Sequence, residues 1–123
     1  MSKTILVVDD SATMRRMVMA SLRTEDVRFD QAETGLEAIE RLTLSPADLV
    51  VLDLNMPDVH GLEVLRFIRT HQAFREIPVV VLTTRGDDAS REAALTGGAT
   101  LYLTKPFAPD SFAPHVRRLL QEE

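Results

Sequence analysis

Asp48-Leu-Val-Val-Leu-Asp-Leu-Asn-Met-Pro57 is the stretch of sequence that decides the fold. Its residues 49–52 form an unbroken apolar run rich in branched side chains, which is typical of a strand buried on both faces in a parallel sheet. The run ends on a charge, Asp53. Open α/β sheets place their ligand sites beyond the carboxyl ends of central strands. Asp53 is therefore either a functional carboxylate or a residue that only ends the strand or caps a turn.

Length and composition exclude several classes of protein. The 123 residues, 45 % of them hydrophobic, predict one domain over residues 1–123. The absence of cysteine excludes disulfides, a thiol nucleophile and a zinc–thiolate site. The net charge of -5 argues against direct nucleic-acid binding. The N-terminus does not resemble a signal peptide, and no apolar run approaches the roughly 18 residues of a membrane span, so we expect a cytoplasmic protein.

Strands and helices alternate along the rest of the chain. Further strands are predicted at Thr4–Val8, Val27–Ala32, Pro78–Leu82 and Thr100–Leu103. Helices are predicted after Ser11 or Thr13, after Gly35, after the loop Pro57–Gly61, from Asp87-Asp88 to Gly97-Gly98, and from Pro109 or Asp110 to near the end. Five strands alternating with five helices predict a parallel sheet covered on both faces, which is a doubly wound α/β fold.

Apolar residues at helical spacing predict the buried faces of these helices. The expected core residues are Met14, Met17, Val18 and Leu22 in the first helix, Leu36, Ile39, Leu42 and Leu44 in the second, Leu62, Val64, Leu65, Phe67 and Ile68 in the third, and Phe112, Val116, Leu119 and Leu120 in the last. Pro114 is expected within about the first turn of the last helix, where a proline is tolerated best. His60, His71 and His115 are interpreted as surface residues.

Four predicted strands end on charged or polar groups: Asp9-Asp10, Asp53, Thr83 and Lys105. In a parallel sheet these ends share one edge, so three carboxylates would lie together with one ammonium group and one hydroxyl. Two like charges about 4 Å apart repel by roughly 4 kcal/mol at an effective dielectric near 20. Lys105 supplies one positive charge, and Mg²⁺ is the expected second cation. The alternative is a set of unconnected loop residues.

With these residues, the chain resembles the receiver domains of two-component response regulators. It resembles most closely the single-domain, CheY-like chemotaxis type. The resemblance covers nearly the whole sequence. The residues that carry it are Val-Val-Asp9-Asp10-Ser, Asp53-Leu-Asn-Met-Pro57 with Gly61, Thr83, and Lys105-Pro106-Phe107. It implies a flavodoxin-like sheet with strand order 2-1-3-4-5.

The resemblance also assigns roles to individual residues. Asp53 would accept a phosphoryl group from the phosphohistidine of a sensor kinase. Asp10 would bind Mg²⁺ directly, Asp9 mainly through water, and Asn55 through its backbone carbonyl. Thr83 and Lys105 would contact phosphoryl oxygens. The same chemistry is reasonable on its own, since a cation, an ammonium group and a hydroxyl stabilise the charge of phosphoryl transfer.

Two further features follow from the resemblance. The Lys105–Pro106 peptide is expected to be cis, and Tyr102 matches the family's switch aromatic, which would turn from solvent to a buried rotamer when Asp53 is phosphorylated. The surface that changes would comprise residues 88–95, the strand with Tyr102 and the last helix. There we expect a target protein, such as a flagellar motor protein, or a second receiver in a weak phosphorylation-dependent dimer. The receiver would not be an enzyme beyond its own phosphorylation and dephosphorylation.

Three positions affect the expected lifetime of the phosphorylated form. Thr84 stands where the family usually has alanine or glycine, and we expect its bulk to restrict access to the phosphoryl group. Asn55 and Arg85, each two residues beyond a site residue, flank the attacking water in relatives.

Other functions were weighed against this one. A haloacid-dehalogenase-like phosphatase needs a second aspartate two residues after the nucleophile, and Asn55 cannot replace that general acid. A flavodoxin-like FMN binder needs a phosphate-cradling loop after the first strand, where Asp9-Asp10 would repel a phosphate unless metal were bound. A receiver inside a hybrid kinase or phosphorelay is the alternative setting, whereas the complete set of site residues argues against a degenerate receiver that only docks.

Overall fold

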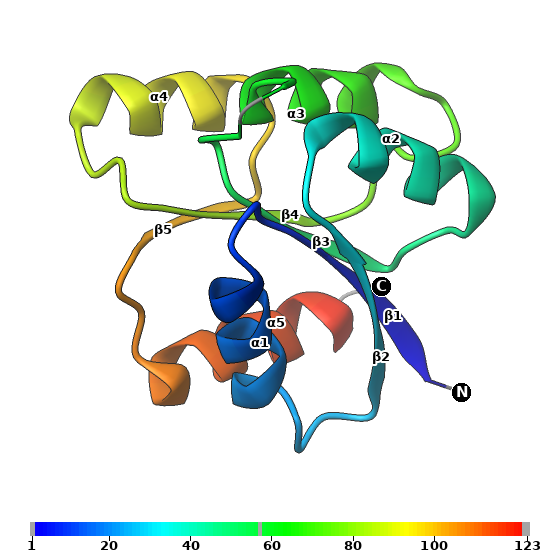
Figure 1. Ribbon diagram of the computed structural model, residues 1–123, viewed down its shortest axis with the longest axis vertical. Helices are drawn as coiled ribbons and strands as arrows, with labels where there is room; N and C mark the ends of the chain where they lie inside the picture. The colour runs from blue at the N-terminus through cyan, green and yellow to red at the C-terminus, as the bar shows by residue number, and fades with distance from the viewer. Residues whose placement is uncertain (1, 57, 122–123) are drawn as a thin grey trace.

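The computed structural model describes residues 2–56 and 58–121, and in this part of the chain five strands form one sheet with helices on both faces (Figure 1). Pro57, which was expected to open a loop, lies outside the described residues. In chain order the elements are β1 (Lys3–Val8), α1 (Ala12–Ser21), β2 (Val27–Ala32), α2 (Gly35–Leu44), β3 (Leu49–Leu52), α3 (Gly61–Thr70), β4 (Val79–Thr83), α4 (Asp88–Thr96), β5 (Leu101–Thr104) and α5 (Pro109–Gln121).

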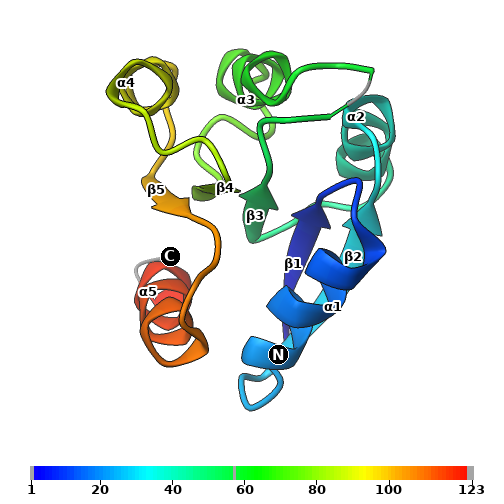
Figure 2. The same cartoon turned by 60° about the vertical axis from the view of Figure 1, so that its left-hand side comes forward.

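All neighbouring strands are parallel, and their order is β2-β1-β3-β4-β5. The predicted doubly wound α/β fold with strand order 2-1-3-4-5 is confirmed. β3 lies in the middle, paired with β1 through Ile5 and Leu49 and with β4 through Val50 and Val79. Helices α2, α3 and α4 cover one face of the sheet, and α1 and α5 cover the other (Figures 1 and 2).

Two hydrophobic cores lie on the two faces of the sheet. Val50 and Leu52 belong to the core under α2, α3 and α4, whereas Leu49 and Val51 belong to the core under α1 and α5. All four side chains are buried because successive strand residues point to opposite faces, and both faces are covered. This explains why the central strand is a continuous apolar run and not an alternating one.

Polar side chains cap the N-termini of helices at positions where the sequence predicted caps. Ser11, one of the two caps proposed for α1, accepts a hydrogen bond from the Met14 amide; Asp87 accepts one from the Ser90 amide at α4. Each cap satisfies an amide that has no partner within its helix. Asp9, Asp53 and Lys105 are therefore held by elements with well-defined ends.

Some predicted core residues are exposed. Met17 is 46 % exposed, Leu36 55 % and Leu44 81 %. In α2 the buried positions are Gly35, Ala38 and Leu42. Leu36 is turned by about 100° from Gly35 around the helix, and Leu44 is the last helical residue, so neither points into the core. The prediction was wrong for Leu36 and Leu44 because the packed line of α2 runs through Gly35, Ala38 and Leu42.

The observed bounds of β4 and β5, and the place of Pro114 in α5, also differ from the prediction. β4 extends to Thr83 and β5 to Thr104, so these two threonines belong to the strands themselves. Pro114 lies in the second turn of α5, further into the helix than expected. The predicted inward residues of this helix, Phe112, Val116, Leu119 and Leu120, are buried as expected.

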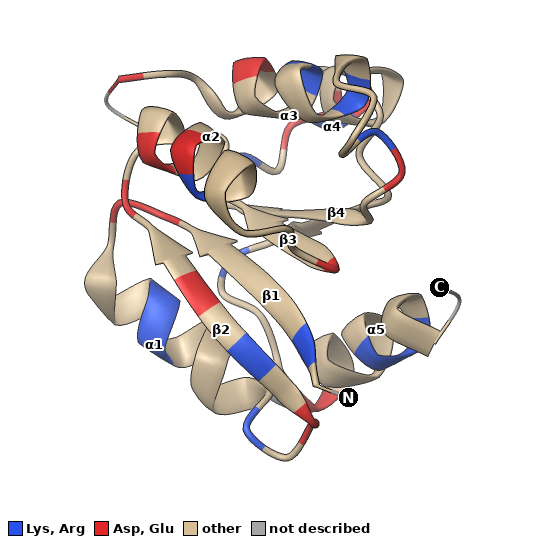
Figure 3. Ribbon diagram, turned by 90° about the vertical axis from the view of Figure 1, so that its right-hand side faces the viewer, with Lys and Arg blue, Asp and Glu red and all other residues tan. Residues whose placement is uncertain are grey.

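Charged residues of both signs are distributed over several helices and strands in the view of Figure 3. None of the helices in the described residues combines the length and apolar character that are needed to cross a bilayer.

Candidate functional site

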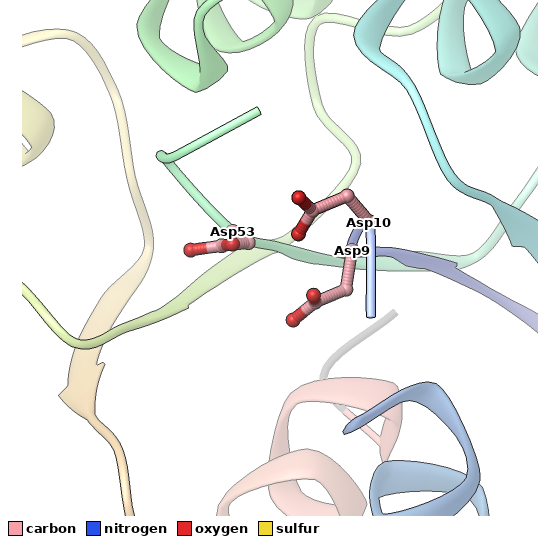
Figure 4. Close-up of side chains that lie close together, drawn as sticks. All are labelled: Asp9, Asp10 and Asp53. Carbon is pink, nitrogen blue, oxygen red and sulfur yellow. The ribbon is translucent and has the colours of Figure 1, made fainter. Parts of the chain in front are cut away.

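Three carboxylates meet at the carboxyl edge of the sheet. Asp9 and Asp10 follow β1, and Asp53 follows β3, the neighbouring strand (Figure 4). One oxygen of each carboxylate lies within 4.8 Å of the others. Asp9 and Asp53 are buried, with 4 % and 5 % of their surface exposed, whereas Asp10 is exposed. The parallel pairing of β1 with β3 produces this cluster, since it aligns the two strand ends.

Lys105 brings a positive charge into the cluster from the end of β5. Its Nζ donates a hydrogen bond to Asp9 Oδ2 at 2.7 Å and lies 3.6 Å from Asp53 Oδ2. Only 10 % of the lysine side chain is exposed. The Lys105–Pro106 peptide, which follows β5, is cis. The expected meeting of strand ends therefore includes the ammonium group.

Asp53 is held in an environment that disfavours its charge. Burial raises the pKa of this carboxyl, the Lys105 ammonium lowers it, and the Asp9 carboxylate raises it further. Hydrogen bonds from the Asn55 amide and the Thr83 hydroxyl lower the pKa more weakly. The net direction is upward, so one lysine does not balance the buried negative charge.

Thr83 and Asn55 border Asp53 in different ways. Thr83 is fully buried at the end of β4, and its Oγ1 accepts a hydrogen bond from the Arg85 amide at 3.3 Å. Asn55 is exposed, and its amide donates to Asp53 Oδ1 at 3.4 Å. Both residues, predicted as site residues, thus lie at the cluster. Thr84 and Arg85 are exposed in the loop that follows Thr83.

Tyr102 is buried in this structure, with 3 % of its surface exposed. Its hydroxyl donates a hydrogen bond to the Arg85 carbonyl, and the Arg91 guanidinium carbon lies 5.7 Å from the ring centre. The sequence-based expectation placed the ring in solvent until Asp53 is phosphorylated. The structure shows the buried rotamer of this expectation, in which the loop after Thr83 supplies the acceptor for the Tyr102 hydroxyl.

Arg15 is a contributor that the sequence analysis did not identify. Its Nη1 donates to the Asp9 carbonyl at 2.6 Å, and its Nε donates to Gln31 Oε1 at 2.9 Å. The Ser11 amide also donates to Asp9 Oδ1 at 2.9 Å. Together these bonds fix the chain between β1 and α1. A signal was present in the sequence, since Arg15 follows Asp9 by six residues on the first turn of a capped helix.

Of the three predicted surface histidines, His60 and His71 are exposed and His115 is half-buried. His60 caps α3 through Nδ1, which accepts from the Leu62 amide at 3.1 Å. His71 stacks on Phe74 with ring centres 4.4 Å apart.

The donor set of the cluster fits a hard divalent cation. Carboxylate oxygens are the ligands that Mg²⁺ prefers, and few carboxylates plus water form its usual protein site. Asp9, Asp10 and Asp53 provide such oxygens within 4.8 Å of one another. A dication would neutralise the charge that Lys105 leaves unbalanced.

Comparison with known proteins agrees with this geometry. A family model, the response regulator receiver domain, matches residues 5–117. The chemotaxis protein CheY1 of Helicobacter pylori is 44 % identical over 85 % of this chain and 86 % of its own length. The transcriptional regulatory protein ResD of Bacillus subtilis is 40 % identical over 95 % of this chain, which spans only 48 % of that regulator. A putative response regulator from Chloroflexus aurantiacus superposes with a TM-score of 0.92 at 29 % identity, covering 98 % of this chain and 99 % of that one.

The chain therefore belongs to the response regulator receiver domain family of two-component systems, and its fold is CheY-like. Receiver domains are signalling domains and not enzymes of metabolism. They are phosphorylated by histidine kinases and act on downstream targets.

Proposed function

We propose that this chain is a phosphorylation-controlled binding switch in which Asp53 accepts a phosphoryl group from the phosphohistidine of a sensor histidine kinase. The observation that carries this proposal is the buried Asp53 carboxylate beside the Lys105 ammonium and two further carboxylates, at the carboxyl edge of the central strand.

The proposed reaction transfers the phosphoryl group to Asp53 and consumes one proton from solvent. A carboxylate oxygen of Asp53 forms a bond to phosphorus while the bond from phosphorus to the imidazole nitrogen breaks, and the imidazole leaves with its electron pair and takes up a proton. Lys105 and the Thr83 hydroxyl are placed to donate hydrogen bonds to phosphoryl oxygens. Asp9, Asp10, Asp53 and the Asn55 carbonyl would hold Mg²⁺, which stabilises the phosphoryl charge when bound.

Acetyl phosphate, Mg²⁺ and intact-mass measurement test the acceptor. We expect a gain of roughly 80 Da, the mass of one phosphoryl group, whose added charge is about -1.5 to -2. Asp53→Asn should abolish this gain, whereas Asp110→Asn, an exposed acid on α5, should retain it. Native labelling of another carboxylate in Asp53→Asn, or full labelling in excess EDTA, would contradict the proposal.

The output surface is proposed to comprise α4, β5 and α5. A phosphoryl group on Asp53 offers new acceptors to the Thr83 hydroxyl, which now accepts from the Arg85 amide. A change at Thr83 would shift the same loop whose Arg85 carbonyl accepts from Tyr102. The step would then shift the balance between arrangements of Tyr102 toward the buried rotamer, which is the one seen in this structure.

The variant Thr83→Ala distinguishes phosphorylation of Asp53 from the change in target binding that follows it. This variant should still be phosphorylated on Asp53 but should gain little affinity for a target. Moving a two-state equilibrium from about 1:99 to 99:1 takes about 5.5 kcal/mol, so loss of one charge-assisted hydrogen bond is measurable. Equal phosphorylation-induced gains for wild type and Thr83→Ala in a target titration would show that Thr83 does not couple site and surface.

Relatives of different length point to two kinds of protein in which this switch would act. The coverage of 86 % of CheY1 favours a short regulator with a separate target protein, such as one in chemotaxis. The coverage of 48 % of ResD favours the receiver part of a longer regulator, for which a weak phosphorylation-dependent dimer is the expected output. Sedimentation of the phosphorylated chain tests the second setting, since a monomer at all concentrations would contradict it.

A further inference from the structure

The loop between β3 and α3, described at residues 53–56 and 58–60, packs closely against its neighbours near the acidic cluster. The Gly61 amide donates to the Leu54 carbonyl at 3.0 Å. A Cβ on Gly61 would lie 2.5 Å from Leu54 Cα and 2.6 Å from the Asp53 carbonyl oxygen. The start of α3 is therefore packed directly onto the end of the central strand. This contact holds the α3 end of the loop in place.

The other side of the loop is tied to a different helix. Asp58 Oδ1 accepts from the Gly35 amide and Oδ2 from the Leu36 amide, both at 3.0 Å. These are the first two amides of α2, which have no partner within the helix. The positive end of the helix also favours a carboxylate. A Cβ on Gly35 would lie 2.7 Å from Val59 Cβ and from its carbonyl oxygen, so no room separates loop and helix.

Asp58 does not belong to the acidic cluster, which consists of Asp9, Asp10 and Asp53 among the described residues. It lies three residues beyond Asn55, a distance that the chain spans in at most about 10 Å. The Asn55 amide donates to Asp53 Oδ1 at 3.4 Å. A shift of the loop at Asp58 would therefore reach Asn55 and, through it, the Asp53 carboxylate.

We infer that Asp58 is a positioning residue for the metal site: its two hydrogen bonds to α2 hold the loop that carries Asn55. This inference rests on the proposed function in one respect, since it requires that Mg²⁺ binds at the cluster. Coupling between two sites is reciprocal. Mg²⁺ binding should consequently slow hydrogen exchange of the Gly35 and Leu36 amides, which both donate to Asp58.

Calorimetric titration with Mg²⁺ alone tests the inference. Asp58→Ala should weaken Mg²⁺ binding by roughly three- to tenfold, at or below the roughly 10- to 100-fold effect of residues bonded directly to metal ligands. The matched control is Thr34→Ala, which removes another cap of α2, the bond from the Glu37 amide at 3.0 Å, without touching the loop. Both variants should lower Tm, but Thr34→Ala should keep the wild-type affinity within about twofold. Asp58→Asn, which retains one acceptor oxygen, should fall between wild type and Asp58→Ala.

The outcomes separate this inference from the proposed function. A wild-type chain that does not bind Mg²⁺ would overturn the proposed metal site itself. A wild-type chain that binds, with equal affinity in Asp58→Ala or an equal loss in Thr34→Ala, would overturn the role of Asp58 alone. If Asp58→Ala does not fold, exchange in the wild type decides: unchanged rates at Gly35 and Leu36 on saturation with Mg²⁺ would contradict the coupling.

Discussion

The Asp53 carboxylate is proposed to act as the nucleophile, yet its charge destabilises the folded protein. Burial raises the pKa of its carboxyl above the ordinary value of 3.8, although the Lys105 ammonium opposes this. The folded chain therefore binds a proton at Asp53 more tightly than the unfolded chain does. Stability consequently falls as pH rises through the window above 3.8, and the penalty is complete above the folded-state pKa. The carboxylate most useful as a nucleophile is destabilising without a bound cation.

Asp53→Asn should therefore stabilise the metal-free protein at neutral pH, because the burial of the carboxylate and its repulsion by Asp9 outweigh its attraction to Lys105. Lys105 retains its 2.7 Å contact with Asp9 in this variant. Urea unfolding in EDTA at pH 7 and below pH 3.8 measures the effect, and the difference between variant and wild type should vanish at the lower pH. A variant that is less stable than wild type at pH 7 would contradict this account.

Tyr102 offers a direct spectroscopic measurement, because the chain has one tyrosine and no tryptophan. Burial, and next the Asp87 charge, raise the pKa of its hydroxyl above 10.0, while Arg85 and Arg91 oppose the rise. Ultraviolet titration should give a midpoint above 10. Arg91→Ala should raise the pKa of Tyr102 further, and Asp87→Asn should lower it. A midpoint at or below 10 in the wild type would indicate that the ring is mainly outside in solution.

At the scale of elements, the contact between α3 and β3 depends on the absence of a side chain at Gly61. An added Cβ would overlap Leu54 Cα and the Asp53 carbonyl at 2.5 and 2.6 Å, and both are backbone atoms that cannot move aside locally. Gly61→Ala should therefore destabilise the fold by about 2 kcal/mol or more. Gly86→Ala is the matched control, since its Cβ meets only Thr104 Cγ2 at 3.5 Å and should cost less than about 0.5 kcal/mol. Thermal unfolding in EDTA measures both, and similar losses would contradict the clash.

Arg69 links three segments at the edge of the sheet opposite the acidic cluster. From α3 it donates to the carbonyls of Gly98 at 2.9 Å, Arg75 at 3.1 Å and Ile77 at 2.6 Å. Burial lowers the pKa of its guanidinium, and the bonds to carbonyls compensate for lost water.

Arg69→Met should cost about 2–4 kcal/mol, because it keeps the apolar stem but leaves partly buried carbonyls without donors. Arg69→Lys should recover only part of this loss, since one ammonium group cannot reproduce the planar fork. Denaturant unfolding distinguishes the three proteins. Equal stability of Arg69→Lys and wild type would show that charge alone, and not the fork geometry, matters.

For the whole molecule, a bound cation should change global stability and not only the site. The three carboxylates come from two strand ends that are brought together only in the folded chain, so Mg²⁺ should bind the native state preferentially. At ten times its Kd, Mg²⁺ should stabilise the protein by about 1.4 kcal/mol. For a chain of 123 residues this corresponds to a rise in Tm of roughly 3–6 °C.

Scanning calorimetry with and without Mg²⁺ tests this expectation. Asp10→Ala should lose most of the rise and Asp9→Ala less, because Asp10 is the exposed carboxylate of the cluster whereas Asp9 already accepts from Lys105 and Ser11. An Na⁺ control of equal ionic strength should give no comparable rise. A larger loss of stabilisation in Asp9→Ala than in Asp10→Ala would reverse the proposed order of the two ligands.

The sequence by itself predicted the layered architecture and the meeting of the strand-end residues. Continuous apolar runs such as Leu49–Leu52 are typical of doubly covered parallel strands, and their alternation with helical segments predicted the layers. Because parallel strands end on one edge, the positions of Asp53 and Lys105 in the chain already predicted that they would meet. Periodicity and cap chemistry placed the helices within a few residues.

Only the tertiary structure decided which face of each helix packs and how the loops are held. Leu36 and Leu44 fit a helical period, yet α2 packs along the line of Gly35, Ala38 and Leu42 and leaves them exposed. The buried state of Tyr102 depends on a carbonyl in another loop. The bonds of Asp58 to α2 join residues 22 and 23 positions apart. Such contacts depend on where separate segments lie in space, and a local pattern of residues carries no information about that.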